Sequence, residues 1–94
     1  MNRRSFHLDH AGHSITVELA GRLTREVDLL VDGKEVGLRR EHGAESVLLA
    51  GDLPDDPPLP FTVRVDHTQH GIRNAECVLV IEGREIPMPE RAAA

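Results

Sequence analysis

The chain has 94 residues, enough for one domain with a single core, and carries 16 acidic against 11 basic residues for a net charge of −5. This charge disfavours nucleic acids and anionic membranes as partners, and the only aromatic residues, Phe6 and Phe61, offer little for stacking against bases or sugars. The single cysteine, Cys77, excludes an internal disulfide, and no apolar run approaches the length of a membrane span, so we expect a cytoplasmic protein.

The first part of the chain alternates between apolar and polar residues, which is typical of half-buried β-strands. Residues 5–8 predict a first strand, and a turn at 9–12 leads into a second strand at 13–19. A longer strand is expected at 23–31, after a break in the alternation. All but one of the basic residues are Arg, a bias that suggests a GC-rich coding sequence and therefore a bacterial protein.

The next strand is expected at 34–40, with Val36 and Leu38 pointing into the core. Gly37 falls on the other side of this strand from Val36 and Leu38, and a glycine there indicates a bulge or a close approach of another backbone. A helix over 39–50 is the main alternative in this part of the chain, and an interior glycine and a β-branched valine both disfavour it.

The second half contains two further strongly alternating segments. A short apolar strand at 45–50 is followed by a loop at 51–60, whose four prolines exclude both a helix and a central strand. Alternation resumes at 61–66, a polar connection follows at 67–74, and the most apolar strand is expected at 75–81.

One strand–turn–strand pattern occurs twice, at 27–36 and at 77–86. In each copy an apolar run leads into an acidic residue and a glycine, then a base, a Glu and a β-branched residue. An acid–Gly pair between apolar runs predicts a two-residue hairpin turn, because both of its positions need a positive φ. The second copy therefore predicts a last strand at 84–87.

Together these segments predict an all-β protein, an antiparallel β-sandwich of seven or eight short strands joined largely by hairpins. We expect a single domain over 1–87 and a disordered C-terminal tail over 88–94.

Three apolar residues fall on the sides of their strands that parity turns away from the core: Leu30, Val78 and Val80. A strand that is apolar on both sides is normally covered on both sides. Either another part of the chain covers these residues, or a protein partner or second copy does. We therefore expect a non-enzymatic protein-interaction or accessory module, with these three residues as candidate partner contacts.

Histidines suggest an alternative function, a metal- or small-ligand-binding protein. His7, His10 and His13 are spaced three apart, and His67 and His70 repeat the spacing. His7 and His13 could face each other across the turn, although tetrahedral sites need convergent ligands that spacing alone does not supply. Histidines solvated in turns are the simpler interpretation, and a shared response to falling pH is a further one.

No other motif points to chemistry or to a cofactor. The acidic residues Asp52, Asp55 and Asp56 lie among prolines that work against wrapping a loop around Ca²⁺. Neither a nucleophile elbow nor a phosphate-binding glycine loop is present, and Cys77, within an apolar run, is expected to be an inert buried thiol.

The hairpins also resemble those of a known family. Segments 31–36, 62–66 and 78–84 occur in an order and at a spacing similar to one domain of the Fas apoptotic inhibitory molecule family, over residues 13–87. That family is built of compact antiparallel β-sandwich domains, so the resemblance implies a sandwich and favours protein binding. It supplies no catalytic residue, and this chain has no Trp or Tyr.

Overall fold

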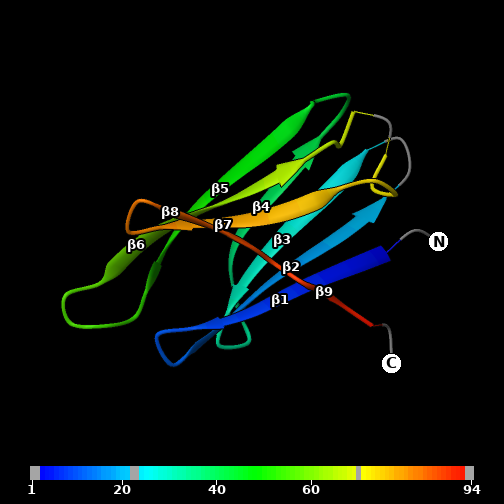
Figure 1. The fold of residues 1–94 in the computed structure, drawn as a ribbon. Helices are drawn as coiled ribbons and strands as arrows, with labels where there is room; N and C mark the ends of the chain where they lie inside the picture. The colour runs from blue at the N-terminus through cyan, green and yellow to red at the C-terminus, as the bar shows by residue number, and fades with distance from the viewer. Residues whose placement is uncertain (1–2, 22–23, 70, 93–94) are drawn as a thin grey trace.

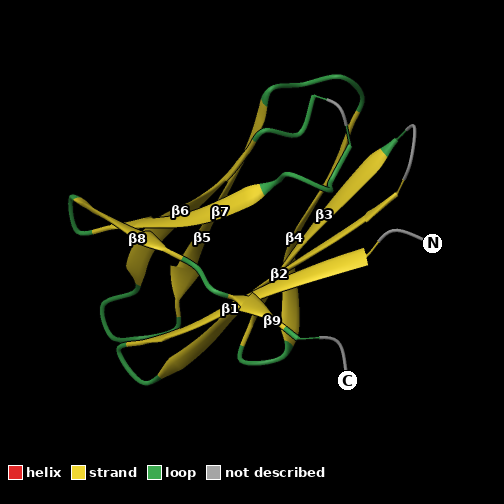
Figure 2. Cartoon of the chain, turned by 45° about the vertical axis from the view of Figure 1, so that its right-hand side comes forward, coloured by secondary structure: helices red, strands yellow, loops and turns green. Residues whose placement is uncertain are grey.

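The computed structural model describes residues 3–21, 24–69 and 71–92, and these form two antiparallel sheets that pack against each other (Figures 1 and 2). One sheet has the strand order β4-β3-β2-β1-β9 and the other the order β5-β6-β7-β8. The strands are β1 (Arg3–His10), β2 (His13–Gly21), β3 (Arg25–Val31), β4 (Lys34–Glu41), β5 (Ser46–Leu53), β6 (Leu59–Asp66), β7 (Glu76–Ile81), β8 (Arg84–Pro87) and β9 (Glu90–Arg91).

This arrangement confirms the predicted all-β antiparallel sandwich, with nine strands in place of seven or eight. The predicted start of the third strand, at residue 23, lies outside the described residues, and β3 begins at Arg25. Within the described ranges, no helix is long and apolar enough to cross a bilayer.

The core lies between the two sheets and is almost wholly aliphatic. Alternate residues of β2, β3, β6 and β7 are buried, as their alternation predicts. The largest fully buried side chains are Ile15, Val17, Leu19, Val27, Leu29, Val47, Leu53, Val63, Val65, Ile72, Leu79 and Ile81. Successive side chains of a strand point to opposite faces of its sheet. The buried residues therefore mark the inner face of each of the two sheets.

The connections of four hairpins gather at one end of the sandwich, at the left and lower left of Figure 1, which we call the hairpin end. Asp32 and Gly33 have φ values of 52° and 83°, and Glu82 and Gly83 have φ values of 52° and 73°. Both positions of each turn are therefore left-handed, which confirms the two predicted acid–Gly hairpin turns.

Strand β4 corrects the prediction that Val36 and Leu38 point inward. The register with β3 shifts between Leu29 and Leu30, so β4 contains one extra residue and the parity reverses beyond it. Val36 and Leu38 are 48% and 43% exposed, and Gly37 faces the core. The register shift confirms the predicted bulge. The close neighbour of this glycine is a side chain rather than a backbone, since a Cβ at position 37 would lie 3.2 Å from Leu49 Cδ2.

The proline-rich connection is shorter than predicted. Strand β5 continues to Leu53, which is fully buried, and β6 begins at Leu59, so the loop covers 54–58 rather than 51–60. The alternative helix over 39–50 is wrong, because these residues form the end of β4, a turn and the start of β5.

The C-terminal segment joins the two sheets, which corrects the predicted tail over 88–94. Met88 is buried, and its backbone N–H donates to the carbonyl of Cys77 at 2.9 Å. The chain then crosses to the other sheet, where the His7 N–H donates to the Pro89 carbonyl at 2.9 Å and β9 pairs with β1 (Figure 2). Residues 93–94 lie outside the described residues.

Candidate functional site

The outer face of the four-stranded sheet carries the most exposed large apolar side chain. Because Cys77, Leu79 and Ile81 point into the core, Val78 and Val80 point outward, where they are half-buried. Strand pairing places two rows across this face: Leu48, Arg64 and Val78 in one, and Ala50, Thr62 and Val80 in the other. We call Leu48, Ala50, Thr62, Val78 and Val80 the apolar face. Leu48 is 54% exposed.

A shallow hollow of about 440 Å³ opens at one side of the apolar face, toward the hairpin end. Three residues with little or no side chain, Ala50, Gly51 and Gly83, contribute to its lining. Val80 also lines the hollow, as do the acidic residues Asp52 and Glu82. The hollow thus combines an apolar surface with two carboxylates.

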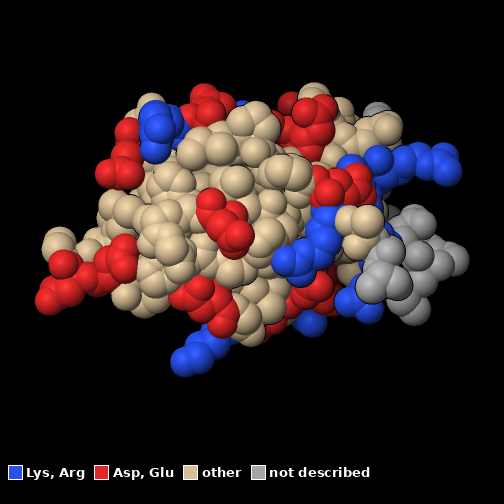
Figure 3. All heavy atoms as spheres, turned by 60° about the horizontal axis from the view of Figure 1, so that its bottom comes forward, with Lys and Arg blue, Asp and Glu red and all other residues tan. Residues whose placement is uncertain are grey.

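Arg64 is the one cation within the rows of the apolar face, and its charge is balanced locally. Its guanidinium donates to Asp66 Oδ2 and to Glu85 Oε1, each at 2.9 Å. These two carboxylates hold the pKa of Arg64 above its usual value. Figure 3 shows basic and acidic side chains interspersed on the face in view, without a large area of either charge alone.

Leu30, the third predicted contact, lies on the opposite side of the molecule. It belongs to the outer face of the five-stranded sheet, where it pairs with Thr16 of β2 and Glu35 of β4. Its side chain is half-buried. The structure therefore brings Val78 and Val80 together and places Leu30 on a separate surface.

The surface around Leu30 is acidic. Asp28 lies two residues before Leu30 on β3 and pairs across the strands with Glu18. Partial burial, together with the neighbouring carboxyl group of Glu35, raises the pKa of Asp28 to about 6. Glu18 and Glu26 add to the repulsion. Several carboxyl groups therefore lie close together around Asp28.

The predicted histidine cluster does not converge on one point. His7 lies on β1 and contacts Thr16 Oγ1 and Asp9 Oδ1, each at 3.0 Å. His67 lies after β6, with its Nε2 3.8 Å from Glu76 Oε1. His70 is outside the described residues. Among the residues described, no three or more His, Cys, Asp or Glu side chains are arranged to hold a metal ion.

His13 instead connects three turns at the hairpin end. Its Nδ1 lies 2.6 Å from Asp32 Oδ2, and its Nε2 lies 2.7 Å from Asp55 Oδ1. Both ring nitrogens thus face carboxylates and can donate together only when the imidazole is charged. The hydrogen bonds to Asp55 and Asp32 raise the pKa of His13 accordingly. Asp55, expected in a solvated acidic loop, therefore has a cross-sheet partner.

His10 makes a weaker link of the same kind. It pairs with His13 across the β1–β2 hairpin, and its Nε2 lies 3.9 Å from Glu82 Oε1 in the β7–β8 turn. Both histidines therefore lie between the two sheets at the hairpin end. The sequence shows each residue of these contacts in a turn, but their approach to one another depends on the packing of the sheets.

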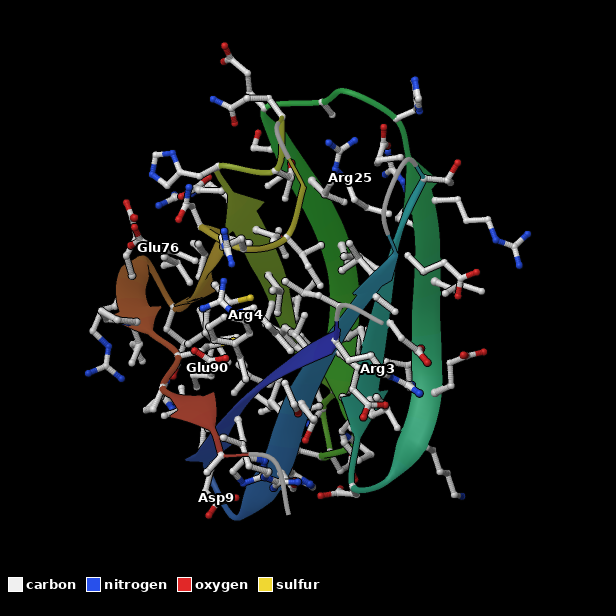
Figure 4. The ribbon with its side chains drawn as sticks, turned by 90° about the vertical axis from the view of Figure 1, so that its right-hand side faces the viewer. Arg3, Arg4, Asp9, Arg25, Glu76 and Glu90 are labelled. Carbon is white, nitrogen blue, oxygen red and sulfur yellow. The ribbon has the colours of Figure 1, made fainter. Side chains whose placement is uncertain are left out.

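Arg4 forms the corresponding junction where the C-terminal segment crosses between the sheets. Its Nη1 donates to the carbonyls of Ile72, Arg73 and Ala75 at 2.7, 2.9 and 2.8 Å. Its other nitrogens donate to both carboxylate oxygens of Glu90 at 2.9 and 3.0 Å, and the two side chains lie together in Figure 4. Arg4 thereby connects β1, the β6–β7 connection and β9.

Cys77 packs in the core near this junction. Burial raises the pKa of its thiol to about 12, so the group is neutral at physiological pH. An uncharged, buried thiol is a poor nucleophile and a poor metal ligand, because both tasks need the thiolate.

At the end opposite the hairpins, buried polar side chains hold the connections in place. Thr68 is fully buried and donates from Oγ1 to the Ala44 carbonyl at 2.7 Å. Arg25 is 6% exposed and donates from Nη2 to the Gln69 carbonyl at 3.0 Å, at the top of Figure 4. These contacts are structural, since they satisfy loop carbonyls that β-pairing leaves without a donor.

Comparison with known proteins adds no relative: no family model, no curated protein and no solved structure matches this chain. The functional argument therefore rests on the geometry described above.

Proposed function

We propose that the chain is a non-enzymatic interaction module that binds a partner protein through the apolar face. The observation that carries this proposal is the position of Leu48, 54% exposed, on the same outer sheet face as Val78 and Val80, where Ala50, Thr62 and Val80 line the hollow. An exposed apolar patch rimmed by polar groups is typical of a protein-binding surface.

The shape of the hollow supports a protein partner over a small molecule. Small-molecule sites are usually enclosed and bury most of their ligand, whereas this hollow is shallow and open. Such a surface can accept side chains that project from a partner. Arg64, already neutralised by Asp66 and Glu85, can be covered without leaving a charge unbalanced.

The state of the candidate catalytic groups also supports a binding role. The Cys77 thiol is buried and protonated, and the ring nitrogens of His13 are both engaged by carboxylates. Neither group is therefore set up as a nucleophile or as a free base. A single buried cysteine also fits a reducing compartment, and we propose the cytoplasm as the place where the module works.

The test compares affinity capture by the wild-type protein with capture by Leu48→Asp and Val80→Asp. We expect both variants to lose a specifically captured partner while Asn74→Asp, which adds the same charge at an exposed position outside the apolar face, leaves it in place. Leu48 is the stronger test, because its exposure means that a charge there should not unfold the domain.

Two outcomes would oppose the proposal. Capture that is unchanged by Leu48→Asp would exclude the apolar face as the binding surface. A concentration series in light scattering would separate a partner protein from a second copy, because self-association of the wild type that Leu48→Asp abolishes would assign the face to a dimer.

A further inference from the structure

The outer face of the five-stranded sheet combines exposed aliphatic side chains with carboxylates. Leu30 and Leu38 lie on it, and the register places Asp28 directly beside Leu38 and Glu35 beside Leu30. The exposed Val36 is the extra residue of the adjoining bulge. We call the set Glu18, Glu26, Asp28, Leu30, Glu35, Val36 and Leu38 the acidic face. It lies on the other side of the sandwich from the apolar face.

The apolar members are exposed for a structural reason. The bulge in β4 reverses parity, so Val36 and Leu38, which would otherwise point into the core, face solvent at 48% and 43% exposure. Bulges are often used to re-aim side chains in this way. An isolated domain gains no stability from exposing two large aliphatic residues on an edge strand.

Asp28 is unfavourable in the isolated domain. Asp28 Oδ1 is shielded from solvent and has no hydrogen-bond partner within the described part of the chain. Glu35 on β4, Glu18 on β2 and Glu26 on β3 all face Asp28 and raise its pKa. Two of these neighbours have basic side chains close by: Arg40 Nε donates to Glu26 Oε2 at 3.2 Å, and Arg3 and Arg91 line a hollow together with Glu18.

From these observations we infer that the acidic face docks a basic segment of a partner protein, with a Lys or Arg between Asp28 and Glu35 and aliphatic side chains against Leu30 and Leu38. Charge complementarity selects this occupant. A second copy of the same face would add repulsion, and nucleic acids or anionic lipids would be repelled. The inference does not rest on the proposed function of the apolar face, because the two surfaces share no residue.

The test uses a nine-residue peptide of alternating Lys and Leu, with Lys–Ser and Glu–Leu peptides of the same length as controls. Titrations followed by ¹H–¹⁵N NMR should show shifts at Asp28, Leu30 and Leu38 with the Lys–Leu peptide. We expect at least tenfold weaker binding of the Lys–Ser peptide and no binding of the Glu–Leu peptide. Affinity should also fall several-fold as salt rises from low to physiological concentration.

The matched variants separate a docking site from general attraction to an acidic protein. The double variant Asp28→Asn, Glu35→Gln should bind the Lys–Leu peptide at least tenfold more weakly. Its NMR spectrum should match that of the wild type at residues away from the two substitutions. Glu45→Gln combined with Asp56→Asn removes the same charge from other exposed positions and should change affinity less than twofold. Leu38→Ser, at an exposed position, should weaken binding of the Lys–Leu peptide without altering the charge or the fold of the domain.

Four results would overturn the inference. The first is no shift at millimolar Lys–Leu peptide, and the second is equal binding of the Lys–Leu and Lys–Ser peptides. The third is an equal loss of affinity in the two double variants, which would show that net charge alone attracts the peptide. Shifts confined to the apolar face would likewise reject the acidic face while leaving the proposed function intact.

Discussion

Arg4 and His13 both tie the two sheets together, but they do so with different chemistry. Arg4 has a permanent charge, is largely shielded, and donates to three backbone carbonyls and one carboxylate. His13 holds two carboxylates across three turns and can donate to both only while it is protonated. The comparison shows how one sandwich can have a junction whose cation keeps its charge at neutral pH at one edge and a junction whose cation titrates near neutral pH at the hairpin end.

Removing the Arg4 junction should have the largest effect on stability. Arg4→Met would leave three carbonyls and Glu90 without their donor, so we expect a loss of about 2 to 4 kcal/mol in the free energy of unfolding, measured by urea denaturation. Arg4→Lys should recover only part of this loss, because an ammonium cannot reproduce the fork of donors. A wild-type midpoint in Arg4→Met would show that the junction adds nothing to stability.

Breaking the His13 junction should lower stability by less than breaking the Arg4 junction, and the size of the loss should depend on pH. His13→Gln keeps a donor and an acceptor but loses the charge that faces Asp32 and Asp55, so its unfolding midpoint should fall at pH 6 and approach the wild-type midpoint at high pH. Asp55→Asn serves as the second arm of a double-mutant cycle. Additive losses from the two substitutions would mean that the contact is not coupled in solution.

The pH profile of the wild type should show the same junction without a mutation. Because folding raises the pKa of His13 above its usual 6.5, the stability that it contributes is complete below that value and is lost as pH rises through the raised pKa. Asp32 behaves in the opposite way. Its lowered pKa means that its contribution is lost as pH falls toward and below 3.8. Urea midpoints between these limits should therefore be highest, and His13→Gln should flatten the alkaline side.

Substitution of Asp28 should have the smallest effect on stability, and unlike the other substitutions it should not lower stability. Its folded pKa of about 6 lies above the usual 3.8, so this group opposes folding as pH rises between the two values. Asp28→Asn should therefore leave the domain as stable or slightly more stable at pH 7, by less than about 1 kcal/mol after screening by solvent. A clear loss of stability would mean that the carboxylate is structural, whereas a gain with weaker peptide binding is typical of residues kept for binding.

The local features of the sandwich could be predicted from the chain, and the errors have identifiable causes. The turns at Asp32–Gly33 and Glu82–Gly83 and the buried faces of the alternating strands depend on neighbouring residues only. Val36 and Leu38 were placed inside because parity counting assumes an unbroken ladder, and the β4 bulge adds one residue. The C-terminal segment was expected to be frayed because two residues of strand β9 carry no alternation, although hydrogen bonds to Cys77 and His7 hold it.

For the candidate surfaces too, some features could be predicted from strand parity and others depend on how the strands assemble into sheets. The outward direction of Leu30, Val78 and Val80 follows from strand parity, since side chains alternate along each strand whatever the sheet does next. That Leu30 lies on one side of the molecule and the two valines on the other depends on which sheet each strand joins. The exposed Leu48 and the hollow beside Val80 also depend on that assembly.

By itself, the sequence determined the class of fold, the hairpin turns, most of the core and the overall acidity, because all of these follow from local patterning and composition. Only the tertiary structure decided that Arg4 and His13 join the two sheets, that the described histidines form no metal-binding group, and that Asp28 faces Glu35. Those contacts join residues far apart in the chain, and strand pairing, register and one bulge set their distances.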